Sequence, residues 1–259
     1  MSRAVAAIGS KLPKGWGDLG RQIGILVGVD IIYELGRGIA DSTKADALTH
    51  GAQVINWEQS THTFFEPSLQ EAFLPAHWLI DVANQLYLNA QFSIALGFLV
   101  WLYLFRNQSY YFVRNMFVVS MCLALIGYVG FPTAPPRMFP ADGFVDTITR
   151  FSDVNHDSTL AKVFINPYAA VPSMHCAFAM MIGATGVMVC RHWWSKAWWA
   201  FWPILITWVV IVTGNHYWID AVLGWLVALT AFAIARGALA RVRPEAWAWR
   251  PPAPREVEA

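Results

Sequence analysis

Residues 198–235 read WWAFWPILITWVVIVTGNHYWIDAVLGWLVALTAFAIA, and this stretch decides the fold. Two apolar runs, at 198–213 and 217–236, lie on either side of a short polar turn at 214–216. Each run approaches the roughly 20 apolar residues that an α-helix needs to cross the hydrocarbon core of a bilayer. The stretch therefore predicts two successive transmembrane helices whose connecting turn lies at one membrane face.

Apolar windows of similar length recur upstream, so the sequence predicts six spans in all. The four further windows are 22–39, 78–105, 115–132 and 173–190. The first of them is interrupted by Asp30, Glu34 and Arg37. We therefore expect a polytopic, all-α bundle of six transmembrane helices.

The segment between the first two windows predicts an additional helix that lies along the membrane surface. Its aromatic and apolar side chains alternate with charged ones, and Pro67 suits the first turn of a helix. The apolar members are Trp57, Phe64, Phe65, Leu69 and Phe73. The full expected fold is the six-helix bundle plus this interfacial amphipathic helix.

Composition supports a membrane protein and excludes other classes. The 259 residues are 56% hydrophobic and 14% charged, with a mean hydropathy of +0.41, whereas soluble domains carry about 25% charged residues. The chain contains 14 Trp and 16 Phe, which are frequent at membrane interfaces. The net charge of +1 provides no basic field for a nucleic-acid partner.

The basic residues predict the orientation of the bundle. With six spans and a cytoplasmic N-terminus, 13 Lys and Arg residues fall on the cytoplasmic side and 5 on the other side. Such an excess follows the positive-inside rule. We therefore expect both termini in the cytoplasm and the long loop at about 133–170 outside the cell.

The expected division of the chain has three parts. Residues 1–21 form a cytoplasmic N-terminal segment, and they lack the apolar core of a cleaved signal peptide. Residues 22–240 form the membrane domain, with candidate motifs between 130 and 220. Residues 241–259 are rich in proline and charge, so we expect a flexible cytoplasmic tail.

His216 and Asp220 form the clearest candidate for chemistry. Their i, i+4 spacing puts both side chains on one helix face, where the carboxylate can accept a hydrogen bond from the imidazole. The other ring nitrogen is then left as a nucleophile or base. The alternative is a histidine–aspartate contact that only ties two helices together.

Three further residues are expected at the same outer face. His175 follows Pro172 and Ser173 at a predicted helix start, where exposed N–H groups favour an anion. Arg137 follows two prolines and could bind phosphate oxygens through parallel hydrogen bonds, although a cation at headgroup level is the alternative. Together with His216, these groups favour a phosphoester site.

The motifs PTAPPR (132–137), PSMH (172–175) and TGNHYWID (213–220) resemble those of the membrane-bound type 2 phosphatidic acid phosphatase superfamily. The most similar branch contains inositol phosphorylceramide synthase. The segments WEQSTHTFFEPSLQ (57–70) and GFVDT (143–147) resemble bacterial members of that branch, which implies a bacterial plasma membrane. Three ordered motifs are a far more specific signal than one short pattern.

The resemblance implies a mechanism and a class of substrate. His216 would attack phosphorus to give a phosphohistidine, Asp220 would stabilise the imidazolium, and His175 would act as acid and then as base. Arg137 and Ser173 would bind the phosphate of a membrane lipid. The acceptor would be water in a phosphatase, or a polyol such as inositol or a lipid hydroxyl in a phosphotransferase.

The sequence also departs from the wider superfamily pattern. Gly130 occupies the place of the lysine in the first motif, and Val209 and Val210 replace the Ser-Arg that begins the third. Two of the usual phosphate-binding cations are therefore missing. This favours the transferase-like branch over phosphatases of simple soluble substrates, or a looser phosphate contact that Ser173, Asn215 or a further residue supplements. Because no carboxylate cluster suggests a divalent ion, we expect catalysis without a metal or another cofactor.

Polar residues in the second span suggest a headgroup or acceptor site. Asp81, Asn84 and Gln85 recur at i, i+3 and i+4, in the same leaflet as the candidate motifs. They could bind a polyol, but hydrogen bonding between helices is an equal alternative.

Non-catalytic readings of the whole chain remain open as well. One is a small transporter, although related halves with interrupted helices are not evident. Another is a haem protein with His175 and His216 as axial ligands, and a third is an inactive relative of the enzymes.

Overall fold

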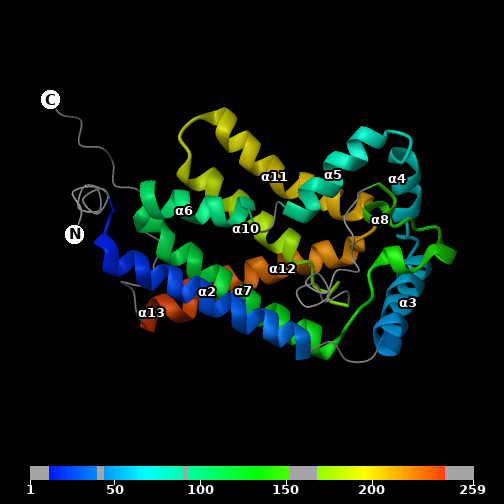
Figure 1. The fold of residues 1–259 in the computed structure, drawn as a ribbon, viewed down its shortest axis with the longest axis horizontal. Coiled ribbons are helices and arrows are strands. Elements are labelled where there is room, and N and C mark those ends of the chain that lie inside the picture. The colour runs from blue at the N-terminus through cyan, green and yellow to red at the C-terminus, as the bar shows by residue number, and fades with distance from the viewer. Residues whose placement is uncertain (1–11, 40–43, 90–92, 152–167, 243–259) are drawn as a thin grey trace.

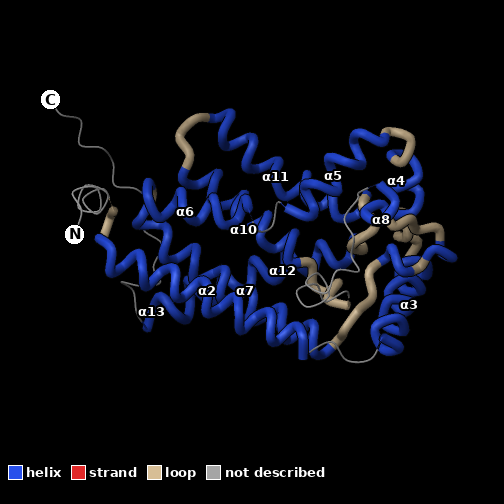
Figure 2. Tube along the Cα trace, viewed as in Figure 1, coloured by secondary structure: helices blue, strands red, loops and turns tan. Residues whose placement is uncertain are grey.

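The computed structural model describes residues 12–39, 44–89, 93–151 and 168–242. Within these residues every regular element is a helix, and an isolated parallel bridge between Thr133 and Ala169 is the only strand-like pairing (Figure 2). The prediction of an all-α protein is thus confirmed. The N-terminal segment at 1–11 and the tail at 243–259 lie outside the described residues.

The helices follow one another in a long series along the chain. In the first half they are α2 (Gly15–Ile39), α3 (Lys44–Ser60), α4 (Glu66–Phe73), α5 (His77–Asn89), α6 (Ala95–Phe105) and α7 (Asn107–Gly130). In the second half they are η2 (Pro136–Met138), η3 (Pro140–Asp142), α8 (Thr147–Phe151), α10 (Met174–Val189), α11 (Trp193–Val212), α12 (Trp218–Ile234), η4 (Ala235–Leu239) and α13 (Ala240–Val242).

Three of the described helices are long and apolar enough to cross a membrane: Asn107–Gly130, Trp193–Val212 and the continuous helical stretch Trp218–Val242. They coincide with three of the six predicted windows. The other predicted spans have no such match. Window 78–105 contains α5 and α6, with residues 90–92 outside the described residues, α10 has only 16 residues, and α2 carries the charges noted above. The count of six spans therefore stays a prediction.

The long helices form an elongated bundle in which α10 packs between α11 and α12, and α7 packs against α2 and α12 (Figure 1). Small residues permit the close contact of α10 with α11. A Cβ atom added at Gly186 would lie 2.3 Å from the ring of Trp199, so only glycine fits there. Close approach at small residues is typical of helix packing in membranes, because lipid provides no hydrophobic drive between helices.

The start of α2 and the short helix α13 lie at one end of the bundle, whereas α3, α4 and α8 gather at the other end (Figure 1). α4 begins at Glu66 with Pro67 in its first turn, as the sequence predicts. Its polar residues Glu66 and Gln70 are buried, while Trp57 of α3 and Phe65 are exposed. This segment therefore turns Glu66 and Gln70 towards the protein and the side chains of Trp57 and Phe65 outwards.

Candidate active site

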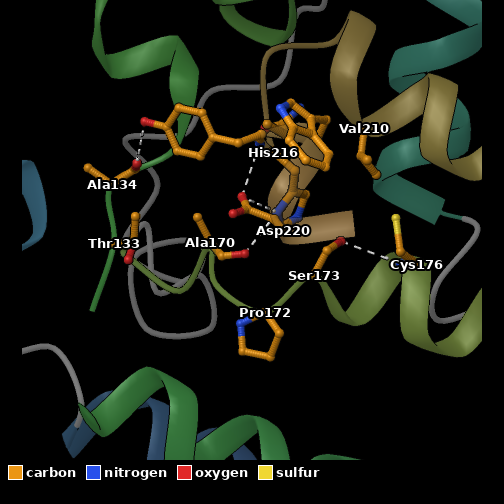
Figure 3. Close-up of polar contacts among 12 residues, drawn as sticks. Thr133, Ala134, Ala170, Pro172, Ser173, Cys176, Val210, His216 and Asp220 are labelled. Carbon is orange, nitrogen blue, oxygen red and sulfur yellow. Dashed lines mark hydrogen bonds and ion pairs between the residues drawn. The ribbon is translucent and has the colours of Figure 1, made fainter. Parts of the chain in front are cut away.

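The three motif segments meet at the end of the bundle that carries α3 and α4. The main chain joins the two ends of the long loop at about 133–170, because the N–H of Thr133 donates to the carbonyl of Tyr168 at 2.8 Å and the N–H of Ala170 donates to that of Thr133 at 3.2 Å. The hydroxyl of Tyr217 donates to the carbonyl of Ala134 at 3.1 Å, which connects the loop to the start of α12 (Figure 3). The central part of this loop, 152–167, is outside the described residues.

His216 lies in the tight turn between α11 and α12. Gly214 has φ +70°, a left-handed conformation that glycine adopts without strain. The turn directs the imidazole inwards, where the residue is 5% exposed. Its Nδ1 is 2.9 Å from the carbonyl oxygen of Ala170 and 3.4 Å from Oδ2 of Asp220 (Figure 3). A carbonyl oxygen only accepts hydrogen bonds, so Nδ1 carries the hydrogen and Nε2 keeps its lone pair.

The surroundings of His216 keep its ring neutral. Burial lowers the pKa of His216 to about 3; the hydrogen bond to Ala170 acts in the opposite direction, and the positive charge of Arg137 adds to the lowering. A neutral imidazole with a free Nε2 is the form that can act as a nucleophile.

Asp220 is completely buried and performs two tasks in the first turn of α12. Its Oδ2 accepts the backbone N–H of Tyr217 at 3.0 Å and also faces Nδ1 of His216. Within the described residues, its Oδ1 has no hydrogen-bond partner. The i, i+4 contact expected from the sequence is thus present, but Ala170 is the closer acceptor of the Nδ1 hydrogen.

His175, the second residue of α10, faces His216 with ring centroids 5.8 Å apart. Its Nε2 is 3.1 Å from the backbone carbonyl of Tyr87, and its ring stacks on the Tyr87 ring at 4.4 Å. Because the partner is again a carbonyl, Nε2 carries the hydrogen and Nδ1 is left for proton exchange. The two imidazoles therefore have opposite tautomers, each fixed by a main-chain oxygen.

Arg137 is fixed to the turn that carries His216. Its backbone N–H donates to the carbonyl of Gly214 at 2.8 Å, and its Nη1 donates to Oδ1 of Asn215. Asn215 is held in turn by Oγ1 of Thr213, which accepts from its Nδ2 at 2.8 Å. The Tyr87 hydroxyl also interacts with the guanidinium. Asn215 thus orients the arginine that acts electrostatically on His216.

Ser173 caps the N-terminus of α10. Its Oγ accepts the N–H of Cys176 at 3.4 Å, and its own N–H donates to the backbone carbonyl of Asp220 at 3.1 Å (Figure 3). At this point α10 and α12 come so close that a Cβ atom added at Gly224 would lie 2.2 Å from the carbonyl oxygen of Ser173. This contact sets the separation of the two histidine-bearing segments.

The three candidate headgroup residues are in different surroundings. Asn84 is buried, and its amide exchanges two hydrogen bonds with Thr147: Nδ2 donates to the Thr147 carbonyl at 3.1 Å and Oδ1 accepts from its hydroxyl at 2.8 Å. Asp81 and Gln85 are exposed on α5. The structure does not join the three into one cluster, and a role in binding a headgroup stays a prediction.

Sequence reasoning did not single out Tyr87, Ala170, Glu58 or Glu66 as site residues. Tyr87 and Ala170 act through main-chain oxygens, which leave no signal in side-chain patterns. Glu58 and Glu66 lie in the stretch 57–70 and are completely buried behind Asp220. Their sequence signal was two acidic residues on a segment otherwise rich in aromatic side chains.

The site contains no metal-binding arrangement that the described residues could provide, since no group of three or more His, Cys, Asp and Glu residues is suitably placed among them. What these residues do provide is two neutral imidazoles with free nitrogens, a fixed guanidinium and a helix N-terminus. Such a set can bind an anion and exchange protons with it.

Comparison with known protein families gives one match. A family model described as the PAP2 superfamily matches residues 52–234, which is well over half of the chain and includes all three motifs. No curated protein and no solved structure shows significant similarity to the chain.

Proposed function

The chain belongs to the PAP2 superfamily, and on that basis we propose that it is an integral-membrane enzyme that cleaves or transfers lipid phosphate esters. Family membership and three helices able to cross a bilayer make it a membrane protein with a phosphatase-type function. The motifs PTAPPR and TGNHYWID support the finer assignment to the inositolphosphotransferase-like branch, and the segments WEQSTHTFFEPSLQ and GFVDT support a bacterial plasma membrane.

One observation carries the proposal. The ring of His216, with a free Nε2, lies 5.8 Å from the ring of His175, with a free Nδ1, beside the guanidinium of Arg137. A phosphate ester bound there would have its phosphorus against one nitrogen and its leaving oxygen against the other.

In the first proposed step, Nε2 of His216 attacks phosphorus in line and the bond to the ester oxygen breaks. The negative charge of the bound phosphate favours a proton on Nδ1 of His175, and this proton passes to the leaving oxygen. Asp220 and the carbonyl of Ala170 stabilise the cationic ring of the phosphohistidine, since both face its Nδ1 hydrogen.

In the second step, the acceptor hydroxyl gives its proton to Nδ1 of His175 and its oxygen bonds to phosphorus. The P–N bond breaks, the ring of His216 returns to its neutral form, and His175 again carries the proton with which the first step began. Arg137 and the free N–H groups at the start of α10 balance the charge on the equatorial oxygens in both steps, which is the main requirement of phosphoryl transfer. No residue of this scheme needs a metal ion as a partner.

We also propose that the site faces the extracytoplasmic leaflet. The asymmetry of 13 against 5 basic residues supports this orientation, as does the location of α13 and the start of α2 at the opposite end of the bundle from the histidines. Cysteines placed at positions 150 and 241 test it, since only the first should react with an impermeant reagent added to intact cells.

A product assay tests the function directly. The protein in nanodiscs is supplied with a set of lipid phosphate esters, with and without myo-inositol, and the products are identified by mass spectrometry. Release of inorganic phosphate identifies a phosphatase, whereas a new inositol phosphate ester identifies a phosphotransferase. If no lipid phosphate ester is consumed under either condition, the proposed function is wrong.

Replacing Arg137 by lysine tests the phosphate contact. Lysine keeps the charge but lacks the planar fork that binds Asn215 and two phosphate oxygens together. We expect kcat/KM to fall about 100-fold for Arg137→Lys, measured by phosphate release. The exposed Arg191→Lys is the matched control and should retain wild-type activity. Equal activity of the two variants would contradict a bidentate role for Arg137.

Replacing Gly224 by alanine tests the spacing of the two histidines. The added Cβ must displace Ser173, and His175 moves with it away from His216. A shift of about 1 Å is enough to lower kcat/KM about 100-fold. Gly97→Ala on α6 is the control, because a Cβ there meets no atom within 4 Å. An active Gly224→Ala variant would show that the close contact is unimportant for catalysis.

A further inference from the structure

Three buried carboxyl groups gather where α12 begins. Glu58 comes from α3, Glu66 from α4 and Asp220 from α12 itself, and each residue is 0% exposed. Two of these segments are far from the histidine motifs in sequence. Burying acidic groups is costly unless they are paired or hydrogen-bonded, so this arrangement calls for a physical reason.

Two of the carboxyls hold the free N–H groups at the start of α12. Oε1 of Glu66 accepts the N–H of Trp218 at 3.0 Å, and Oδ2 of Asp220 accepts that of Tyr217 at 3.0 Å. The other oxygen of Glu66, Oε2, accepts the N–H of Phe65 at 3.0 Å. A helix N-terminus leaves such N–H groups without partners within the helix and favours negative charge. Glu66 therefore fastens α12 to α4.

Glu58 is different, because neither of its oxygens makes a hydrogen bond with an N–H or hydroxyl donor of the described residues. Its carboxyl instead contacts that of Glu66. Burial raises the pKa of Glu58 to about 9, and the charge of Glu66, a hydrogen bond with it and the charge of Asp220 add to this rise. The nearby N–H of Ile219, which does not form a full hydrogen bond with either oxygen, acts in the opposite direction. Glu58 is therefore protonated at neutral pH.

We propose that Glu58 and Glu66 share one proton and act as positioning residues, holding the first turn of α12 so that Asp220 stays against His216. The proton on Glu58 forms a hydrogen bond to Glu66, and Glu66 in turn binds the N–H of Trp218. Neither side chain touches the phosphate. This inference rests on the proposed function only for its catalytic consequence, since the shared proton is a property of the fold.

The surroundings of the pair determine how it responds to pH. The charged groups that act on Glu58 are Glu66 from α4 and Asp220 from α12, and Tyr217 lies beside all three carboxyls. Loss of the proton at high pH puts a second negative charge next to Glu66 without a new partner. The repulsion weakens the attachment of α12, so kcat should decline as pH rises through about 9.

Two substitutions of Glu58 distinguish the contribution of a hydrogen-bond donor at this position from that of the ionisable carboxyl group. Glu58→Gln keeps a hydrogen-bond donor beside Glu66 and cannot ionise, whereas Glu58→Ala loses the donor. We expect kcat at pH 7 to fall no more than about threefold in Glu58→Gln and about 30-fold in Glu58→Ala, with KM unchanged in both. In Glu58→Gln the decline of kcat near pH 9 should also disappear.

The glutamine variant of Glu66 should lose much more activity than that of Glu58, although both residues are glutamates. In Glu66→Gln the amide nitrogen must face either the N–H of Trp218 or that of Phe65, and a donor cannot bind a donor. We expect kcat to fall at least about 30-fold. The control is Glu71→Gln, an exposed acid of the same helix, which should match the wild type at every pH.

Thermal unfolding tests the shared proton without any activity assay. The pKa of Glu58 in the folded protein is above its ordinary value of 4.5, so its stabilising proton is fully present below about pH 4.5 and is lost as pH rises through about 9. The wild-type Tm should therefore fall relative to that of Glu58→Gln across this range. Parallel Tm curves for the two proteins would overturn the proposal.

The two readouts separate the possible failures. If Glu58→Gln is as inactive as Glu58→Ala, or if its pH profile equals that of the wild type, the positioning role is wrong. If the wild-type protein turns over no phosphate ester, the proposed function fails, and the Tm comparison still decides whether Glu58 and Glu66 share a proton.

Discussion

Replacing His216 by glutamine is expected to lower kcat/KM for lipid phosphate esters by about 10⁴-fold or more, because removal of an enzymatic nucleophile typically costs at least this much. Glutamine is similar in size, and its side-chain amide can donate to the carbonyl of Ala170 as the imidazole does. The turn should therefore keep its shape while the attacking nitrogen is lost. Turnover is measured as phosphate release from the protein in nanodiscs.

The control for this variant is His192→Gln, since His192 is exposed at the start of α11 and takes no part in the site. Rapid quenching of the wild type with a ³²P-labelled substrate should also trap an acid-labile, base-stable phosphoryl group that His216→Gln lacks. Unchanged turnover in His216→Gln would refute the role of His216 as the nucleophile.

Replacing His175 by asparagine is expected to reduce activity by a factor that depends on the leaving group. An alkyl ester needs a proton on its departing oxygen, so kcat should fall by about 10²- to 10⁴-fold. A p-nitrophenyl ester needs no such proton, because its leaving group is a stable anion. For that substrate the first step should proceed at nearly the wild-type rate, and only release of the phosphate should be slow.

The His175→Asn variant should therefore show a burst of p-nitrophenolate together with accumulation of the phosphohistidine. Stopped-flow absorbance measures the burst, and the quench experiment measures the intermediate. Equal losses for alkyl and aryl esters would contradict a role in protonating the leaving group. They would favour a purely structural part for His175, for example as a stacking partner of Tyr87.

The sequence predicted the class of the fold well, because helix periodicity and bilayer thickness act locally. The windows at 115–132, 198–213 and 217–236 correspond to the three helices that are long and apolar enough to span. The window at 78–105 contains α5 and α6, and residues 90–92 between these helices lie outside the described part of the chain.

The candidate site was predictable where a motif encodes the geometry. The contact of His216 with Asp220 is present as predicted, but His216 lies in the turn before α12 begins, so the two residues do not share a helix face as the i, i+4 spacing suggests. The capping position of Ser173 follows from the proline before it. That the histidines of two motifs lie together was an inference from their common membrane face, and the structure brings their rings to 5.8 Å. The roles assigned to these residues stay predictions.

Other parts of the site could not be read from the sequence. Asn84 looked like a headgroup ligand on an apolar helix, yet its amide is occupied by Thr147 of the long loop. Glu58 and Glu66 looked like charges on a surface helix, yet both are buried beneath α12. For Asn84 and Glu66 the deciding partner is more than 60 residues away, and no local pattern specifies it.

Both imidazoles are oriented by carbonyl oxygens of the main chain, at Tyr87 and at Ala170. A mutational scan that exchanges side chains would pass over these two acceptors, because every amino acid supplies the same oxygen. The hydrogen bond to His216 consequently places no requirement on which side chain stands at position 170. Only a backbone change, such as an ester in place of the amide that follows Ala170, would weaken the acceptor and let the His216 tautomers mix.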